Sequence, residues 1–209
     1  MTHPPTPTPP PAEVRRARPE DAAACARVLR GSRAEAMPWL PVLHTPEEDL
    51  AYLRGVLAQQ RTWVAEADGE VVGFASLDEA EGVLDHLYLD PGSQRRGIGS
   101  ALLTTVRTAY DGPLELWVFA DNTSARAFYA AHGGVELYAT DGAGNEERTP
   151  DVRMRLPAPA QYAYSVWRAT MRARVSTTSG SYSRSMPSSR RSTACSMRSD
   201  STEAPTRSS

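Results

Sequence analysis

The segment from Gln94 to Gly99 constrains this chain more than any other part of its 209 residues. It reads Gln-Arg-Arg-Gly-Ile-Gly and joins a predicted strand, 83–90, to a predicted helix that starts at Ser100. Glycines let a backbone approach a ligand closely, and the free N–H groups of a helix N-terminus attract anions. We therefore interpret the segment as a pyrophosphate-binding loop. A tight strand-to-helix turn without a ligand accounts for so short a pattern equally well.

Two well-known phosphate-binding motifs are excluded at this position. A Walker loop needs Gly-Lys-Ser/Thr, and the whole chain contains no lysine. The dinucleotide fingerprint needs a first glycine that the spacing here lacks.

The apolar pattern on both sides of the loop predicts an α/β domain with a mixed sheet. The pair Asp68-Gly69 is a strong two-residue turn signal between two strands. Gly31 is expected to end the first helix, because glycine suits the position that follows a helix. The connection at 32–44 is too apolar for an idle loop. We expect strands at 14–18, 62–67, 71–77, 83–90, 114–119, 135–140 and 152–156, with helices starting at Pro19, Thr45, Ser100 and Thr123.

Composition divides the chain into three segments. Residues 1–12 are rich in proline and are expected to form a disordered lead-in. Residues 13–156 are expected to form the domain, and they carry a net charge of −8. Residues 157–209 hold 14 serines and a net charge of +6, so we expect a disordered tail. A short helix is expected at 160–175, either loose, docked on the domain, or basic enough to bind a membrane, RNA or a partner.

Several protein classes are excluded by the rest of the sequence. No apolar run approaches the roughly 18 residues that a membrane helix needs. The N-terminus lacks the charged start and apolar stretch of a secretory signal. Cys25 and Cys195 lie too far apart for a metal motif or a disulfide pattern. We therefore expect a soluble, cytoplasmic protein without a bound metal.

A second motif follows the strand at 114–119 and strengthens the interpretation. It runs from Asn122 through Ala125 and Phe128-Tyr129 to Gly133. Together with Gln94, Gly97 and Gly99, these residues resemble the two motifs of the GCN5-related N-acetyltransferase (GNAT) superfamily, although Gly134 stands where the family usually has an aromatic residue. The resemblance covers about residues 13–156. It implies a mostly antiparallel sheet flanked by helices, with a splayed V between the fourth and fifth strands.

The resemblance also implies acetyl-CoA as a co-substrate, bound within this V. The backbone of the fourth strand would pair with the pantetheine arm, the loop would hold the pyrophosphate, and Asn122 and Tyr129 would lie near the reactive end. The implied cofactor-binding residues are Leu87, Tyr88, Leu89, Gln94, Arg95, Arg96, Gly97, Ile98, Gly99, Ser100, Asn122 and Tyr129.

An acetyltransferase of this kind lets an amine attack the thioester directly. The departing thiolate then needs a proton, and a phenol such as Tyr129, with an ordinary pKa of about 10, can supply it. The alternative is that Tyr129 only packs in the core as an aromatic residue beside Phe128. The attacking amine must lose a proton, and the glutamate that family members often use aligns with Val83 here.

Four nearby side chains could replace that glutamate as the base. They are Asp85, Glu81, Glu79 and His86. Regular strand alternation places Asp85 on the same face as Leu87 and His86 on the opposite face. We therefore favour Asp85 as the base. The alternative is that Asp85 has no catalytic role and is a solvated or salt-bridged residue of the strand.

The acceptor side is expected to be walled by Trp39, Leu40 and His44. An acidic loop at 141–151 would face them, and Asp141, Asn145, Glu146 and Glu147 of this loop could close the site. The net negative charge of the domain and the acidic residues of this loop suit a small cationic amine as the acceptor. The alternative is that the loop is an ordinary solvated acidic loop. We expect no nucleic-acid or membrane partner, and a homodimer is possible. A silent acyl-CoA sensor and an acetyltransferase for protein amines are the alternatives.

Overall fold

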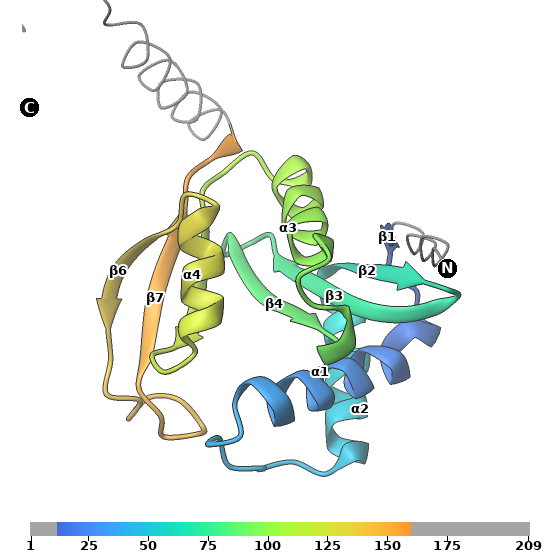
Figure 1. The fold of residues 1–209 in the computed structure, drawn as a ribbon, viewed down its shortest axis with the longest axis horizontal. Helices are drawn as coiled ribbons and strands as arrows, with labels where there is room; N and C mark the ends of the chain where they lie inside the picture. Colours follow the sequence, from blue (N-terminus) through green and yellow to red (C-terminus); the bar gives the residue numbers. More distant parts are fainter. Residues whose placement is uncertain (1–11, 160–209) are drawn as a thin grey trace, which may run out of the picture.

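The computed structural model describes residues 12–159, which form one seven-stranded sheet with helices on both faces (Figure 1). The strand order is β1-β2-β3-β4-β5-β7-β6, and only the β4–β5 pair is parallel. The mixed, mostly antiparallel sheet expected from the sequence is therefore confirmed. The strands are β1 (Glu13–Arg16), β2 (Arg61–Ala67), β3 (Glu70–Asp78), β4 (Val83–Leu89), β5 (Leu114–Phe119), β6 (Val135–Ala139) and β7 (Asp151–Leu156).

Four helices and two short 3-10 turns connect these strands. The helices are α1 (Ala22–Ala36), α2 (Pro46–Gln59), α3 (Ile98–Ala109) and α4 (Thr123–Ala131), and the turns are η1 (Pro19–Asp21) and η2 (Pro91–Ser93). Within residues 12–159, no helix combines the length and apolar character needed to cross a bilayer. The proline-rich residues 1–11 and the expected helix at 160–175 lie outside the described part of the chain.

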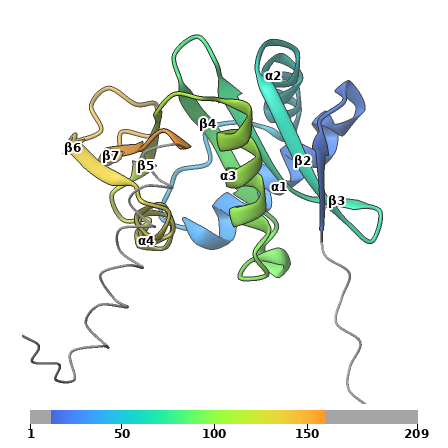
Figure 2. The same cartoon turned by 90° about the horizontal axis from the view of Figure 1, so that it is seen from above.

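Two apolar clusters hold the helices on the sheet. In one cluster, Leu102 and Val106 of α3 and Tyr129 of α4 pack on the inner residues of the sheet. In the other, Val28 of α1 and Leu53 of α2 pack against the opposite face. In both views α4 lies beside β6 and β7, whereas α1 and α2 lie together on the side of β2 and β3 (Figures 1 and 2).

The tight turn between β2 and β3 forms as the sequence predicted. Ala67 pairs with Glu70, which leaves only Asp68 and Gly69 between the two strands. Their φ angles are 53° and 81°, and a two-residue turn that matches the twist of a hairpin needs positive φ at both positions.

The first helix is longer than the sequence predicted, and Gly31 does not end it. The helix continues to Ala36, and Met37 leaves the helical region with φ −138° and ψ 56°. Pro38 explains this end, because a proline disfavours helical backbone in the residue before it. The extra turn carries Arg33 toward the centre of the molecule, where it becomes part of the site described below.

The strands β4 and β5 meet at one end only. Val83 pairs with Glu115, and the backbone N–H of Glu115 donates to the carbonyl of Gly82 at 2.9 Å. No further register pair joins these two strands, both of which lie wholly in the described region. The predicted V between the fourth and fifth strands is confirmed, and it opens an edge of β4 in the middle of the sheet.

Candidate active site

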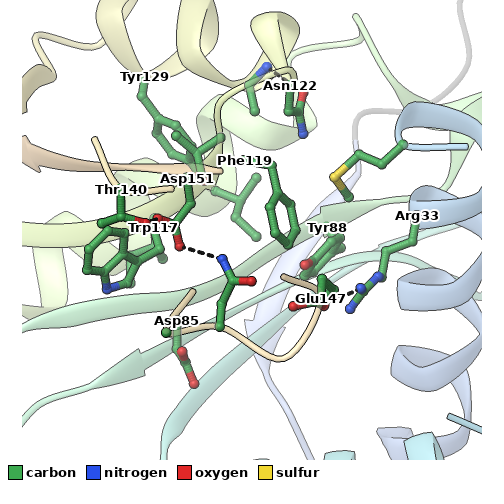
Figure 3. Close-up of a pocket in the computed structure, with 17 residues that line it drawn as sticks. Arg33, Asp85, Tyr88, Trp117, Phe119, Asn122, Tyr129, Thr140, Glu147 and Asp151 are labelled. Atoms are coloured by element: carbon green, nitrogen blue, oxygen red, sulfur yellow. Dashed lines mark hydrogen bonds and ion pairs between the residues drawn. The ribbon is translucent and has the colours of Figure 1, made fainter. Parts of the chain in front are cut away.

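Two openings meet at the splayed strands. The first, of about 470 Å³, is lined by the loop after β4 and by the start of α4. We call this loop, residues 94–100, the glycine loop, and the space beside it the glycine-loop opening. The second, of about 570 Å³, is lined by β5, the β6–β7 loop and the end of α1, and we call it the acidic opening (Figure 3). The residues that line both openings are Met37, Leu87, Tyr88, Asn122, Ala125 and Tyr129.

The backbone of the glycine loop turns through two left-handed residues. Arg95 has φ 58° and Gly97 has φ 81°, and α3 begins immediately afterwards at Ile98. A Cβ added at Gly97 would meet no atom within 4 Å, so open space faces the loop at this point. The first-turn N–H groups of a helix lack partners within that helix, and they attract anions. The arrangement therefore suits a phosphate group.

Most of the loop residues that are expected to bind the cofactor line the glycine-loop opening. These are Gln94, Arg95, Gly97, Gly99 and Ser100. The side chain of Ile98 is instead buried in the core, and Arg96 is exposed outside the opening.

Three residues of β4 present the free edge of that strand to the same opening. Leu87, Tyr88 and Leu89 pair with β3 on one side and line the glycine-loop opening on the other. An extended ligand can therefore hydrogen-bond to β4 as a neighbouring strand would.

The two residues of the second motif lie at the junction of the openings. Asn122 caps α4, because its side-chain oxygen accepts a hydrogen bond from the N–H of Ala125 at 3.1 Å. Tyr129 is only 8% exposed and packs edge-on against Phe128, with ring centroids 5.2 Å apart. Burial raises the pKa of Tyr129 above its ordinary range, so the phenol is protonated at neutral pH.

A bulge in β4 changes the expected direction of Asp85. Ser76 pairs with His86 and Leu77 pairs with Leu84, so Asp85 is an extra residue without a partner in β3. The prediction that Asp85 and His86 point to opposite faces is therefore wrong. Oδ2 of Asp85 lies 3.5 Å from Nδ1 of His86.

Asp85 lines the acidic opening, where Figure 3 shows it at the end away from Asn122. Its carboxylate also accepts a hydrogen bond from the amide of Gln60 at 2.9 Å. Of the other candidate bases, Glu79 is bound to Arg61 at 2.6 Å, and neither Glu79 nor Glu81 lines either opening. Asp85 is thus the candidate that the fold brings to the site.

His86 lies behind the site in a small polar cluster. Its Nδ1 is 2.7 Å from Oγ of Ser76, and its Nε2 is 3.1 Å from the hydroxyl of Tyr52 on α2. Burial lowers the pKa of His86, so the ring is neutral near pH 7. No motif in the sequence marks Tyr52, because its contact with His86 depends on how α2 packs on the sheet.

The acidic opening combines an aromatic wall with carboxylates from two loops. Trp117 and Phe119 come from β5, and Glu147 and Asp151 come from the segment that precedes β7 (Figure 3). Glu147 accepts a hydrogen bond from Arg33.

Two loop residues fix this acidic segment at its base. Asn145 donates to Oδ2 of Asp151 at 3.0 Å and to the carbonyl of Thr149 at 2.7 Å. Asp151 therefore secures the loop, and it lines the opening as well.

Of the residues expected at the acceptor side, Asn145 and Glu147 line the acidic opening, whereas Trp39, Leu40, His44, Asp141 and Glu146 lie outside it. Leu40 and His44 line a separate hollow of about 530 Å³ beside α1, whereas Trp39 is 43% exposed and borders neither opening. Glu146 points away from the opening to His44, at 3.0 Å from Nε2. The rest of the wall contains Arg33 and Trp117, which no motif in the sequence marks, because β5 and the extended α1 bring them together.

Comparison with known proteins agrees with this geometry. Residues 31–133 match the model of the Acetyltransferase (GNAT) family. A GCN5-related N-acetyltransferase from Rhodopseudomonas palustris superposes with a TM-score of 0.61 and 25% identity, covering 73% of this chain and 99% of that one. The domain described here belongs to the GNAT family of acetyltransferases.

Two curated relatives with named acceptors match this chain over only part of their length. A mycothiol acetyltransferase from Thermomonospora curvata is 37% identical over 90 residues, which are 42% of this chain and 30% of that protein. The peptidyl-lysine N-acetyltransferase YiaC from Escherichia coli is 39% identical over 77 residues, which are 37% of this chain and 51% of that protein. The chain thus spans about a third to a half of the length of these relatives.

A solved structure with a bound ligand shares the fold. PaiA N-acetyltransferase from Thermoplasma acidophilum, in complex with coenzyme A, superposes with a TM-score of 0.53 and 20% identity, covering 70% of this chain and 98% of that one.

In the described residues, no group of three or more His, Cys, Asp and Glu side chains is arranged to hold a metal ion.

Proposed function

We propose that this protein transfers the acetyl group of acetyl-CoA to a primary amine of a small, cationic acceptor. One observation carries the proposal. The glycine-loop opening and the acidic opening meet at Tyr129, which lines both. A thioester held from the loop side would therefore face an amine held from the acidic side.

The glycine loop supports acetyl-CoA as the acetyl donor. The left-handed turn at Arg95 and Gly97 leads directly into the N-terminus of α3, which suits the pyrophosphate. The free edge of β4 at Leu87–Leu89 suits the amide groups of the pantetheine arm. Both features line the same opening.

The chemistry that we infer needs a base and an acid on the two sides of the thioester. Asp85 would accept the proton of the attacking amine, directly or through water. The main chain of β4 near Leu87 would donate a hydrogen bond to the oxygen that becomes negative. Tyr129, kept protonated by burial, would donate to the departing thiolate.

The charge of the acidic opening supports a cationic acceptor. Asp85, Glu147 and Asp151 face one cation, Arg33, among the residues that line it. Glu147 is neutralised by Arg33, whereas Asp85 and Asp151 are bound by the neutral amides of Gln60 and Asn145. Two negative charges are therefore available to an ammonium group.

We also place the reaction in the cytoplasm. Cys25 is buried and forms no disulfide within residues 12–159, and a free thiol is typical of a reducing compartment. Small cationic amines and acetyl-CoA would meet the enzyme there.

The direct test is thiol release from acetyl-CoA with a panel of acceptors at equal concentration. The panel should contain cationic diamines, neutral amino sugars, a lysine-containing peptide and an anionic amine. We expect the highest kcat/KM for small cations. Binding of acetyl-CoA without turnover on any acceptor would favour a silent sensor, and a preference for the peptide would favour a protein acceptor.

A further inference from the structure

His132 connects the end of α4 to the glycine loop through two hydrogen bonds. Its Nδ1 lies 2.8 Å from the carbonyl oxygen of Phe128, and its Nε2 lies 3.0 Å from Oγ of Ser100. Ser100 is in the first turn of α3 and lines the glycine-loop opening, whereas His132 does not. The imidazole therefore reaches the opening only through the hydroxyl of Ser100.

The chemistry of these atoms fixes where the protons are. A carbonyl oxygen only accepts hydrogen bonds, so Nδ1 of His132 must carry the hydrogen that it shares with Phe128. In the neutral ring Nε2 is then an acceptor, and the hydroxyl of Ser100 must donate to it. A hydroxyl has a single proton, so Ser100 presents only lone pairs to the opening.

A pyrophosphate would meet an unfavourable partner in this state. Its oxygens are acceptors and carry negative charge, and the lone pairs of Ser100 would face them at the N-terminus of α3. Protonation of His132 reverses the polarity of the chain of hydrogen bonds. Nε2–H would then donate to Oγ of Ser100, and the hydroxyl of Ser100 would donate to the pyrophosphate.

We propose that His132 takes up one proton from solvent when the pyrophosphate of CoA binds at the glycine loop. His132 is thus a positioning residue that orients the Ser100 hydroxyl toward the ligand. The proposal rests on the proposed function, because it needs CoA in this opening. Histidine is the side chain suited to this role, since small changes in its surroundings move its protonation across neutral pH.

The other charged groups near His132 do not supply the same pH dependence. Arg107 of α3 donates to the carbonyl of His132 at 3.0 Å, and Arg95 lines the opening from the loop. Arg126 of α4 is paired with Glu136 of β6. Arginine keeps its charge between pH 6 and 8, because its guanidinium is not deprotonated in proteins.

The test measures the affinity of the full chain for dephospho-CoA between pH 6 and pH 8. This ligand keeps the pyrophosphate but lacks the 3′-phosphate, whose own titration near pH 6 would obscure the result. We expect the Kd to be about three- to tenfold lower at pH 6 than at pH 8, the scale of one hydrogen bond. Calorimetry at pH 7 in two buffers of different ionisation enthalpy should register proton uptake on binding.

Three variants separate the proposed device from other titrating groups. His132→Gln keeps a polar side chain that does not titrate, and Ser100→Ala removes the hydroxyl, so each should abolish the pH dependence and the proton uptake. Ser124→Ala removes another hydroxyl that lines the same opening, and it should keep both. If one variant does not fold, the other still tests the same link.

The outcomes distinguish this inference from the proposed function. Dephospho-CoA that binds with a pH-independent Kd, or with no proton uptake, overturns the role of His132 and leaves the proposed function standing. If the pH dependence persists in both His132→Gln and Ser100→Ala, the role of His132 is likewise overturned and the proposed function stands. No binding of dephospho-CoA or acetyl-CoA at any pH overturns both.

Discussion

Glu147 in the β6–β7 loop accepts a hydrogen bond from Arg33 in the last turn of α1, 114 positions earlier in the chain. The neighbouring Glu146 makes a parallel contact to His44 in the connection between α1 and α2. Two successive glutamates of the β6–β7 loop thus contact α1 and the connection that follows it. The first contact is partly buried, and the second is exposed.

The exposed contact predicts a dependence on pH. Glu146 raises the pKa of His44, chiefly through their hydrogen bond, so folding favours the imidazolium. This stabilisation is complete below the pKa that His44 has in the unfolded chain, and it is lost as the pH rises through the folded value. We expect NMR titration to give a lower pKa for His44 in Glu146→Gln, and the difference in Tm from wild type to shrink between pH 6 and pH 8.5.

Glu47→Gln is the matched control for this experiment, because it removes a carboxylate from the first turn of α2. It should leave the pKa of His44 close to its wild-type value. An unchanged pKa in Glu146→Gln would mean that the contact with His44 does not persist in solution.

Tyr129→Phe should lower kcat far more than it weakens acetyl-CoA binding. The ring keeps its packing against Phe128, while the proton donor is lost. General acid catalysis contributes about 10²–10⁴-fold, and we expect a loss toward the lower end because water can substitute in part. Tyr138→Phe removes a phenol from β6 outside both openings and should retain wild-type kcat. Wild-type turnover in Tyr129→Phe would remove this residue from the mechanism.

Gly97→Asp should weaken CoA binding at least about tenfold, or about 1.4 kcal/mol. The substitution places a carboxylate where the loop faces open space, and it would repel a pyrophosphate there. Aspartate and asparagine tolerate positive φ better than most residues, so Gly97→Asn separates the effect of charge from strain. Gly92→Asp adds the same charge nearby, at a position outside the glycine-loop opening, and should bind CoA more tightly than Gly97→Asp. Equal affinities in isothermal titration would contradict the placement of the pyrophosphate.

Gly134→Ala should destabilise the domain by about 1–3 kcal/mol. A Cβ at this position would lie 2.8 Å from the carbonyl oxygen of Tyr129, which also accepts a hydrogen bond from the Gly134 N–H at 2.9 Å. The backbone that turns away from α4 would have to move. In a domain of this size we expect a fall in Tm of at least about 2 °C. Gly144→Ala, where a Cβ meets nothing within 4 Å, is the control, and a similar loss in both variants would refute the steric explanation.

The same crowding explains a departure from the family pattern noted in the sequence. Gly134 stands where the family usually has an aromatic residue, and the close approach to Tyr129 leaves no room for any side chain in this backbone conformation. The motif alone could identify the departure but not its cause, because the cause is a contact five residues earlier in the chain.

Local signals predicted much of the fold, since each depends on adjacent residues. The turn at Asp68-Gly69 and the start of the helix after Thr45 are both set by their immediate neighbours. The end of α1 differs from the prediction, because Pro38 rather than Gly31 determines it. A glycine permits a helix to end, but a proline prevents it from continuing.

The acceptor side was less predictable, because it depends on register between distant segments. The bulge at Asp85 breaks the alternation on which the direction of that side chain was based, and nothing in the local sequence marks it. Arg33 and Trp117 both line the acidic opening because α1 is longer than expected and β5 diverges from β4. Such placements follow from tertiary packing rather than from a motif.

The single pairing of Val83 with Glu115 has a consequence for hydrogen exchange. It makes β4 an edge strand inside a sheet, so its amides that point toward β5 have no strand partner in the free protein. We expect these amides to exchange as fast as those of a surface edge, although they lie near the centre of the domain. A ligand that pairs with β4 should slow their exchange and leave the amides paired with β3 unaffected, which would map the bound ligand residue by residue.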